Sequence, residues 1–140
     1  MSITLAQADT IITTALQESR TKNLAPMTVV VLDAGGHLVA AKREDNSGIL
    51  RIEIATGKAY GALGFGFSSR GFADKPAGFV SAASVASGGR LVPVPGGVLV
   101  KNAAGAVIGA VGVSGDASNA DEAAALAGIH AAGLASDIAA

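Results

Sequence analysis

Cysteine and tryptophan are absent from this chain of 140 residues, and aromatic residues make up only 4% of it. Without cysteine, the chain can form no disulfide, no thiolate metal site and no cysteine nucleophile. Charged residues are also few, at 15%, and the net charge is −1. So small a net charge gives no broad electrostatic attraction to nucleic acid or to an anionic membrane, and we expect neither as a partner.

Targeting features and long apolar runs are missing too. Residues 1–5 lack the basic start and the continuous apolar core of a secretory signal, and no basic residue precedes Arg20. Glycine, serine or charged residues interrupt each apolar stretch before it reaches the length of a membrane span. These features predict a cytoplasmic protein.

Half of the residues are hydrophobic, which excludes a disordered chain. The length suits one domain, which we expect to span residues 1–140. Glycine is abundant, with 19 residues. Small residues let helices and strands approach closely, but they leave a single domain short of bulky core material. We therefore expect a homo-oligomer, with a ligand pocket shared between copies.

Periodicity and turn residues predict the chain order α-β-β-α-α-β-β-β-α. Thr4 and Gln7 have the spacing of a capping box at a helix start, and residues 33–36 (DAGG) form a tight-turn sequence between two strands. Hairpins joined by helical segments imply an α/β (α+β) domain whose antiparallel sheet of about five strands is flanked by helices. The expected helices cover residues 5–22, 48–64, 76–86 and 118 onward, and the expected strands cover 27–32, 37–42, 91–94, 97–101 and 106–113.

Two of these helices carry further information. The second has glycines at positions 57, 61 and 64. Each glycine costs a helix about 1 kcal/mol, so this ridge indicates a neighbour that packs closely against it. Ser118 is expected to cap the last helix, where Asp121 and Glu122 suit the positive end of the helix dipole. Spacing of four residues predicts an inner face formed by Leu126, His130, Leu134 and Ile138.

Five segments together resemble the GlcG/HbpS family, a haem-degrading, DUF336-like domain family that includes the C-terminal domain of PduO-type proteins. Each motif is weak alone, but the five occur in the family's order over nearly the whole chain, which makes the combination specific. The matching segments are 30–39 (VVLDAGGHLV), 43–45 (RED), 54–59 (IATGKA), 95–98 (PGGV) and 108–115 (IGAVGVSG).

The resemblance implies a profilin-like α/β fold, higher oligomers that are often octamers, and a role linked to haem or to corrinoids. It thus implies haem as the cofactor. The chain departs from some relatives in two ways. Its residues 5–22 contain no histidine, whereas some relatives are reported to place haem-ligating histidines near this helix, and it has no Glu-x-x-Glu iron motif.

Three cations and one acid are candidates for a binding site. Arg51 and Lys58 are seven residues apart on the second helix and therefore share a face, Arg43 ends the second strand, and Glu53 is nearby in sequence. One interpretation is a set of solvated or interface salt bridges. The other is a rim that binds carboxylates, because arginine contacts them with two parallel hydrogen bonds; haem propionates or a small organic acid would both fit it.

Backbone-rich bends supply further candidates. Gly96 and Gly97, and the bend at Ser114, would let a ligand approach main-chain N–H groups. Asp116 is expected to cap or tighten the turn into the last helix. Ser114 does not have the surroundings of a nucleophile elbow, because the last glycine of that motif is missing.

The chain has two histidines, and neither defines a metal site. His37 follows the glycine turn and is expected to be exposed. His130 is either a hydrogen-bonded core histidine or a ligand. Acidic residues and histidines do not occur at metal-ligand spacings, so we predict no metal site formed by these residues.

Three functions fit these observations. The first is a haem-binding or haem-handling protein, as the resemblance implies. The second is an enzyme or binding protein for a small organic acid, with Arg43, Arg51 and Lys58 as anchors and with Glu53 or His130 as an acid–base group. The third is a structural or regulatory oligomer. The sequence leaves open whether the protein is an enzyme.

Overall fold

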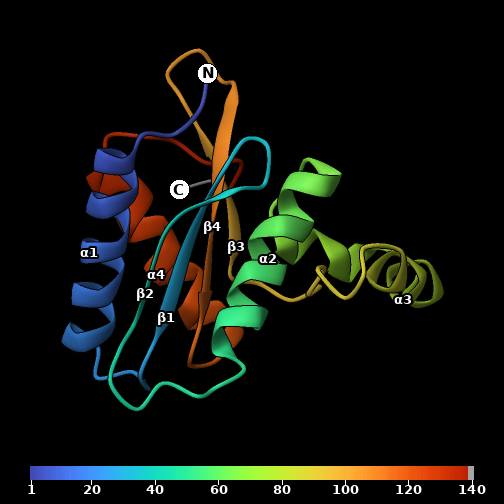
Figure 1. Cartoon of the computed structure of the whole chain (residues 1–140), viewed down its shortest axis with the longest axis horizontal. Coiled ribbons are helices and arrows are strands. Elements are labelled where there is room, and N and C mark those ends of the chain that lie inside the picture. The colour runs from blue at the N-terminus through green and yellow to red at the C-terminus, as the bar shows by residue number, and fades with distance from the viewer. Residues whose placement is uncertain (139–140) are drawn as a thin grey trace.

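The computed structural model describes residues 1–138, in which two pairs of consecutive strands are separated and flanked by helices (Figure 1). The element order agrees with the expected one, except that one expected strand is absent and a 3-10 helix precedes α3. The elements are α1 (Leu5–Thr21), β1 (Thr28–Asp33), β2 (Leu38–Arg43), α2 (Arg51–Phe65), the 3-10 helix η1 (Ser69–Asp74), α3 (Ala77–Ala86), β3 (Gly97–Lys101), β4 (Val107–Ser114) and α4 (Ser118–Ala131). None of these helices is both long enough and apolar enough to cross a bilayer.

The strands form one antiparallel sheet in the order β2-β1-β4-β3. Helices α1 and α4 cover one face and α2 covers the other (Figure 1). Strand β1 is buried on both faces, because alternate side chains of a strand point in opposite directions. Val29 and Val31 pack under α1 and α4, whereas Val30 and Leu32 pack under α2. The fold is thus the expected α/β arrangement with helices on both sides of an antiparallel sheet.

The sheet has four strands rather than five, because residues 91–94 do not join it. Pro93 and Pro95 have no N–H group, so the segment cannot supply the regular hydrogen bonds of a strand. It lies along α2 instead, where the N–H of Val92 donates to the carbonyl oxygen of Gly57 at 3.1 Å. The prediction of a strand here was wrong.

Helix α2 approaches the sheet so closely that two strand positions must be glycine. A Cβ atom on Gly97 would overlap the carbonyl group of Lys58, and a Cβ atom on Gly112 would overlap the carbonyl oxygen of Ala55. Backbone therefore packs on backbone between α2 and the strands β3 and β4. This close packing fixes the position of every side chain that α2 directs toward the end of the sheet.

The glycine ridge of α2 has the close neighbour that its sequence predicts. Gly57 packs against Val92 and Gly61 packs against Leu91, whereas Gly64 has open space around it. The neighbour belongs to the same chain. The space beside Gly57 and Gly61 is therefore filled within one copy.

The predicted starts of the first two helices differ in accuracy. Thr4 accepts a hydrogen bond from the N–H of Gln7, and the side chain of Gln7 accepts one from the N–H of Thr4, so the capping box at α1 is confirmed. Helix α2 starts at Arg51, not at 47–48, and Leu50 precedes it without a side-chain cap. Residues 44–50 form the loop between β2 and α2.

Helix α4 is shorter than predicted and is capped differently. Ser118 is its first residue rather than its cap, and the preceding Ala117 has no capping side chain. The helix ends at Ala131, so Leu134 and Ile138 are not on its inner face. Both instead pack against the core from the segment that follows.

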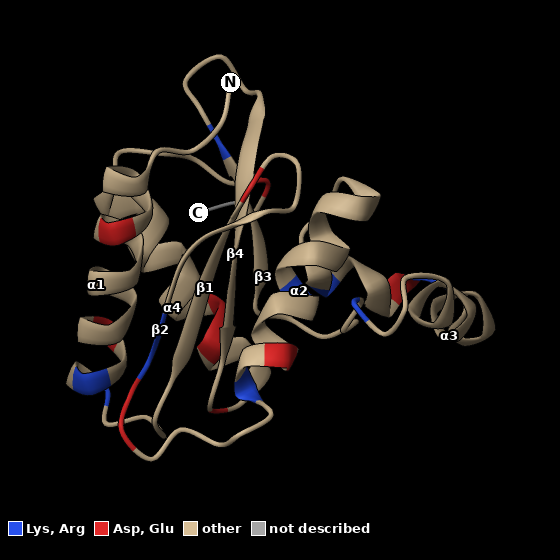
Figure 2. Cartoon of the chain, in the orientation of Figure 1, with Lys and Arg blue, Asp and Glu red and all other residues tan. Residues whose placement is uncertain are grey.

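Helix α3 projects from the rest of the molecule (Figure 1). None of its residues is buried, although Phe79 and Val85 are large and apolar and remain 51% and 80% exposed. The ring of Phe79 contacts that of Phe65, with 5.8 Å between the centroids. Figure 2 shows that α3 carries no charged residue.

Two glycine substitutions test the packing of α2. Gly112→Ala should destabilise the protein by about 1–3 kcal/mol or more, because the new Cβ would push α2 off the sheet. Gly64→Ala should stabilise it by about 0.5–1 kcal/mol, because nothing surrounds this helical glycine. Urea unfolding of both variants measures the two effects; equal changes in the two proteins would contradict this description of the packing.

Candidate functional site

Most of the predicted site residues meet at one end of the sheet, where α2 begins and β4 ends. Arg51 donates from Nη1 to the hydroxyl of Ser114 at 3.1 Å. About two turns further along the same face of α2, Lys58 donates from Nζ to the carbonyl oxygen of Val113 at 2.9 Å. The prediction that Arg51 and Lys58 share a face is confirmed. That face is turned to β4, and Lys58 is only 2% exposed, so it is not the solvated face that one interpretation proposed.

The buried Lys58 forms an ion pair with Asp121 of α4, with 3.1 Å between Nζ and Oδ2. Asp121 is 1% exposed, and its other oxygen accepts a hydrogen bond from the N–H of Asp116 at 2.9 Å. Burial lowers the pKa of Lys58 and raises the pKa of Asp121, while the attraction within the pair opposes both shifts; the nearby Arg51 lowers the pKa of Lys58 further. The pair therefore connects α2 to the start of α4 and leaves Lys58 out of reach of a ligand.

Asp121, which the sequence only suggested as a partner for the helix dipole, is thus central to this end of the sheet. It also holds the turn that precedes α4, by accepting from the main chain of Asp116. The side chain of Asp116 was expected to have this capping role. A buried lysine requires an anionic partner, so knowing that Lys58 is buried would have pointed to a nearby acid such as Asp121. Nothing in the sequence indicated that Lys58 is buried.

Gly96 and Gly97 accommodate α2 rather than an open anion site. Gly96 has a φ of 128°, and a Cβ atom there would lie 2.8 Å from Nζ of Lys58. The N–H of Gly97 donates to the hydroxyl of Ser69 at 2.9 Å. Both glycines are buried, and their backbone is in contact with the chain itself.

Beside this buried cluster lies an exposed loop, residues 43–51, which we call the 43–51 loop. Arg43 is exposed and donates from Nη2 to the carbonyl oxygen of Ser47 at 2.7 Å. Ile49 and Leu50 are 88% and 65% exposed, so two large apolar side chains in adjacent positions project into solvent. The loop therefore carries an apolar pair, with an arginine at each of its two ends.

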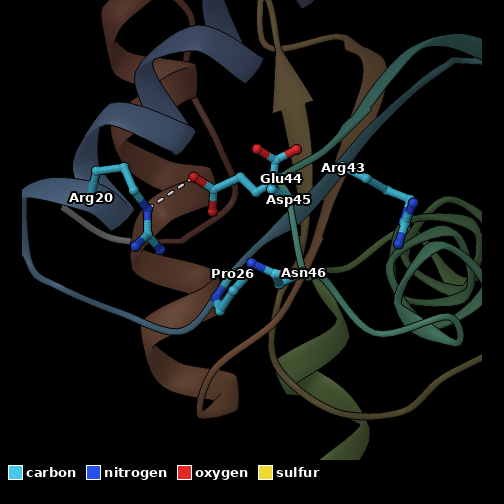
Figure 3. Close-up of a pocket in the computed structure, with 6 residues that line it drawn as sticks. All are labelled: Arg20, Pro26, Arg43, Glu44, Asp45 and Asn46. Atoms are coloured by element: carbon cyan, nitrogen blue, oxygen red, sulfur yellow. Dashed lines mark ion pairs between the residues drawn. The ribbon is translucent and has the colours of Figure 1, made fainter.

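Arg43 also lines an open cavity of about 530 Å³ between the end of α1 and the end of β2 (Figure 3). Within it, Nε of Arg20 lies 2.9 Å from Oε2 of Glu44, and the N–H of Met27 donates to the other oxygen of Glu44 at 2.7 Å. Figure 3 shows Arg20 and Glu44 directed toward each other and Arg43 directed away from them. The lining residues are Arg20, Pro26, Arg43, Glu44, Asp45 and Asn46.

Glu53 and His130 do not join this cluster. Glu53 is exposed on α2 and makes no ion pair within the part of the chain that the structure describes. His130 is exposed near the end of α4, about 13 Å along the helix axis from Asp121. Its predicted place on the inner face was wrong, because Gly128 and Ile129 occupy that face.

His37 lies in the turn between β1 and β2, as expected, and its side chain is exposed. Its Nδ1 atom is 3.2 Å from Oδ1 of Asp33. Among residues 1–138, no group of three or more histidine, aspartate or glutamate side chains is placed to hold a metal ion.

A four-stranded antiparallel sheet with two helices on one face, one on the other and a polar cluster at one end defines the class, a small α/β protein. Residues 3–130 match the family model described as haem degrading protein HbpS-like. The chain therefore belongs to the HbpS-like family, and the resemblance found in its motifs is confirmed.

Solved structures with the same fold include three that cover most of this chain. The PduOC protein in complex with haem has a TM-score of 0.88 at 20% identity, over 96% of this chain and 98% of that one. The Klebsiella pneumoniae protein ORFY has a TM-score of 0.86 at 24% identity, over 94% and 90% of the two chains. HbpS has a TM-score of 0.79 at 25% identity, over 93% and 89%. Among curated proteins, none matches the sequence significantly.

Removing the charge of Asp121 tests the buried pair. Asp121→Asn retains an oxygen for the N–H of Asp116 but leaves the Lys58 ammonium unpaired, so it should cost about 3–5 kcal/mol near neutral pH. The loss should shrink as pH rises. Without the attraction of Asp121, less opposes the effect of burial, so the pKa of Lys58 is lowered further in the variant than in the wild type. Below its ordinary pKa, Lys58 then binds fewer protons in the folded than in the unfolded state, and the stability of the variant rises with pH more than that of the wild type.

Urea unfolding near neutral pH and about two pH units higher measures this dependence. Asp9→Asn is the control, because Asp9 pairs with Lys42 on the exposed surface. A loss in the Asp121 variant that is no larger than in this control, or that grows with pH, would contradict the assignment.

Proposed function

We propose that this protein binds haem and that the 43–51 loop receives it. The observation that carries the proposal is the exposed apolar pair, Ile49 and Leu50, between the arginines at the two ends of the loop. Membership of the HbpS-like family supports haem as the ligand, as does the similarity to the PduOC protein, whose structure is a haem complex.

The chemistry of the loop suits haem, which combines a flat apolar ring with two propionate groups. Burying a large apolar side chain contributes about 1.5–3 kcal/mol, so covering Ile49 and Leu50 with the ring is favourable. Arg43 and Arg51 can each bind a propionate through two parallel hydrogen bonds. The main chain of Ser47 and the hydroxyl of Ser114 already hold these arginines, so little side-chain freedom is lost on binding.

An axial histidine fits this site better from a second copy than from the same one. The 43–51 loop begins beside Thr28, at the start of β1. His37 lies in the turn at the other end of this strand. His130 lies at the far end of α4 from Asp121. Both histidines are exposed and available to a neighbouring molecule.

We further propose that α3 packs against a second copy of the chain. It is a charge-free helix with no buried residue, and it presents Phe79 and Val85 to solvent. Such a surface is typical of an interface that a monomer leaves uncovered. The family resemblance favours an octamer as the assembly. One domain over residues 1–140 and a cytoplasmic location, both predicted from the sequence, are part of this proposal.

A small organic acid is the alternative ligand. It is favoured by the open cavity beside Arg43, whose volume of about 530 Å³ lies in the range of small-molecule sites. Arg43 lines this cavity and would anchor the carboxylate, and a pocket between two copies would enclose it. Lys58 is buried in its ion pair and takes no part in this alternative.

Haem titration followed at the Soret band tests the proposed ligand. The wild-type protein should shift the band at micromolar haem. Arg43→Gln should weaken binding about tenfold, because one charged hydrogen-bonding partner is lost, and Ile49→Ser should weaken it further through lost apolar contact. Lys22→Gln, on the exposed end of α1, is the matched control. Absence of a band shift, or equal affinities in all variants, would rule out this site.

Light scattering tests the role of α3. The wild-type protein should be oligomeric, and Val85→Asp should shift it toward the monomer, because a charge cannot be buried in an apolar interface without a partner. Thr10→Asp, on the exposed side of α1, should leave the assembly intact. A wild-type protein that is monomeric at high concentration would overturn the proposal.

A further inference from the structure

A separate cavity lies between α2 and the turn that follows α3. Its volume is about 320 Å³, which is the lower end of the range for small-molecule sites. Ile52, Glu53 and Thr56 line it from α2, together with the backbone of Gly57, and residues 88–90 line it from the turn. None of the groups proposed to bind haem lines this cavity.

Two opposite charges face this cavity without contacting each other. Glu53 comes from α2 and Arg90 from the turn, and both line the same space. They form no ion pair with each other or with another residue of the described part of the chain. A molecule with a positive and a negative end could therefore bridge them, whereas a molecule with one charge would leave the other unpaired.

Arg90 is held in a position suited to binding an anion. Its guanidinium lies over the ring of Tyr60, with 4.4 Å from Cζ to the ring centroid, and its Nε donates to the carbonyl oxygen of Ser87 at 2.7 Å. The two Nη groups remain for a ligand, in the planar arrangement that matches a carboxylate. Gly88 and Gly89 have φ values of 70° and 81°, and added Cβ atoms there would meet nothing within 4 Å, so the backbone leaves room.

The α2 side of the cavity is suited to the other end of such a ligand. Glu53 offers a carboxylate to an ammonium group. The hydroxyl of Thr56 donates to the carbonyl oxygen of Ile52 at 2.7 Å, so its lone pairs can accept a hydrogen bond from the same ammonium. The side chain of Ile52 supplies an apolar wall.

We propose that this cavity binds a small zwitterion, an α-amino acid with a compact apolar side chain. Its carboxylate binds the Nη groups of Arg90, its ammonium binds Glu53, and its side chain contacts Ile52. The site is independent of the 43–51 loop and needs no haem, so either proposal can fail without the other.

Isothermal titration calorimetry on the haem-free protein tests the proposal with L-alanine and L-valine as probes. Propionate and ethylamine are the one-ended counterparts, since each retains only one of the two charges. The amino acids should bind with millimolar affinity or better, and the one-ended probes should bind at least about tenfold more weakly, because each leaves a charged group without its partner.

Two variants identify the residues. Glu53→Gln and Arg90→Gln should each weaken amino-acid binding at least about tenfold, whereas Glu18→Gln and Lys101→Gln, outside the cavity, should leave it unchanged. Far-UV circular dichroism checks that all four variants are folded. The proposal is overturned if neither amino acid binds, if propionate or ethylamine binds as well as they do, or if binding survives both cavity substitutions.

Discussion

One buried ion pair, between Lys58 and Asp121, joins three parts of this fold. It links α2 to α4, and the hydrogen bond from Lys58 to the main chain of Val113 adds the end of β4. Removing two charges from water is costly, so the pair is tolerated only because further hydrogen bonds satisfy it and because Gly96 leaves space for the ammonium. Its net contribution is thus to specify one arrangement of α2 and α4 at this end of the sheet.

The exposed 43–51 loop depends on that arrangement for its position. Because α2 is fixed against glycines of β3 and β4, its first residue, Arg51, can reach Ser114. The preceding loop is held from its other side, since the hydroxyls of Ser47 and Thr28 lie 2.7 Å apart. A rigid support therefore presents Ile49 and Leu50 to solvent, which is where the proposed haem site lies. The predicted polar residues divide accordingly into a buried support and an exposed binding surface.

What the sequence could predict was mostly local. The capping box of α1 and the turns of both hairpins involve residues within a few positions of each other, and these elements were correct. The burial of Lys58 depends on Asp121, which is 63 positions away, and no local pattern indicates it. The prediction for His130 was wrong because of the close contact between α4 and α1. That contact requires Gly128, whose Cβ would overlap the carbonyl oxygen of Ile11, so Gly128 and the adjacent Ile129 face the core and His130 does not.

In the proposed haem complex, the 43–51 loop forms the haem site, with an arginine for each propionate. A crystal structure of the protein with haem bound measures this most directly. We expect the porphyrin ring to lie against Ile49 and Leu50, with propionate oxygens within hydrogen-bond distance of the guanidinium groups of Arg43 and Arg51. Haem bound elsewhere on the molecule, with both arginines still in solvent, would contradict it.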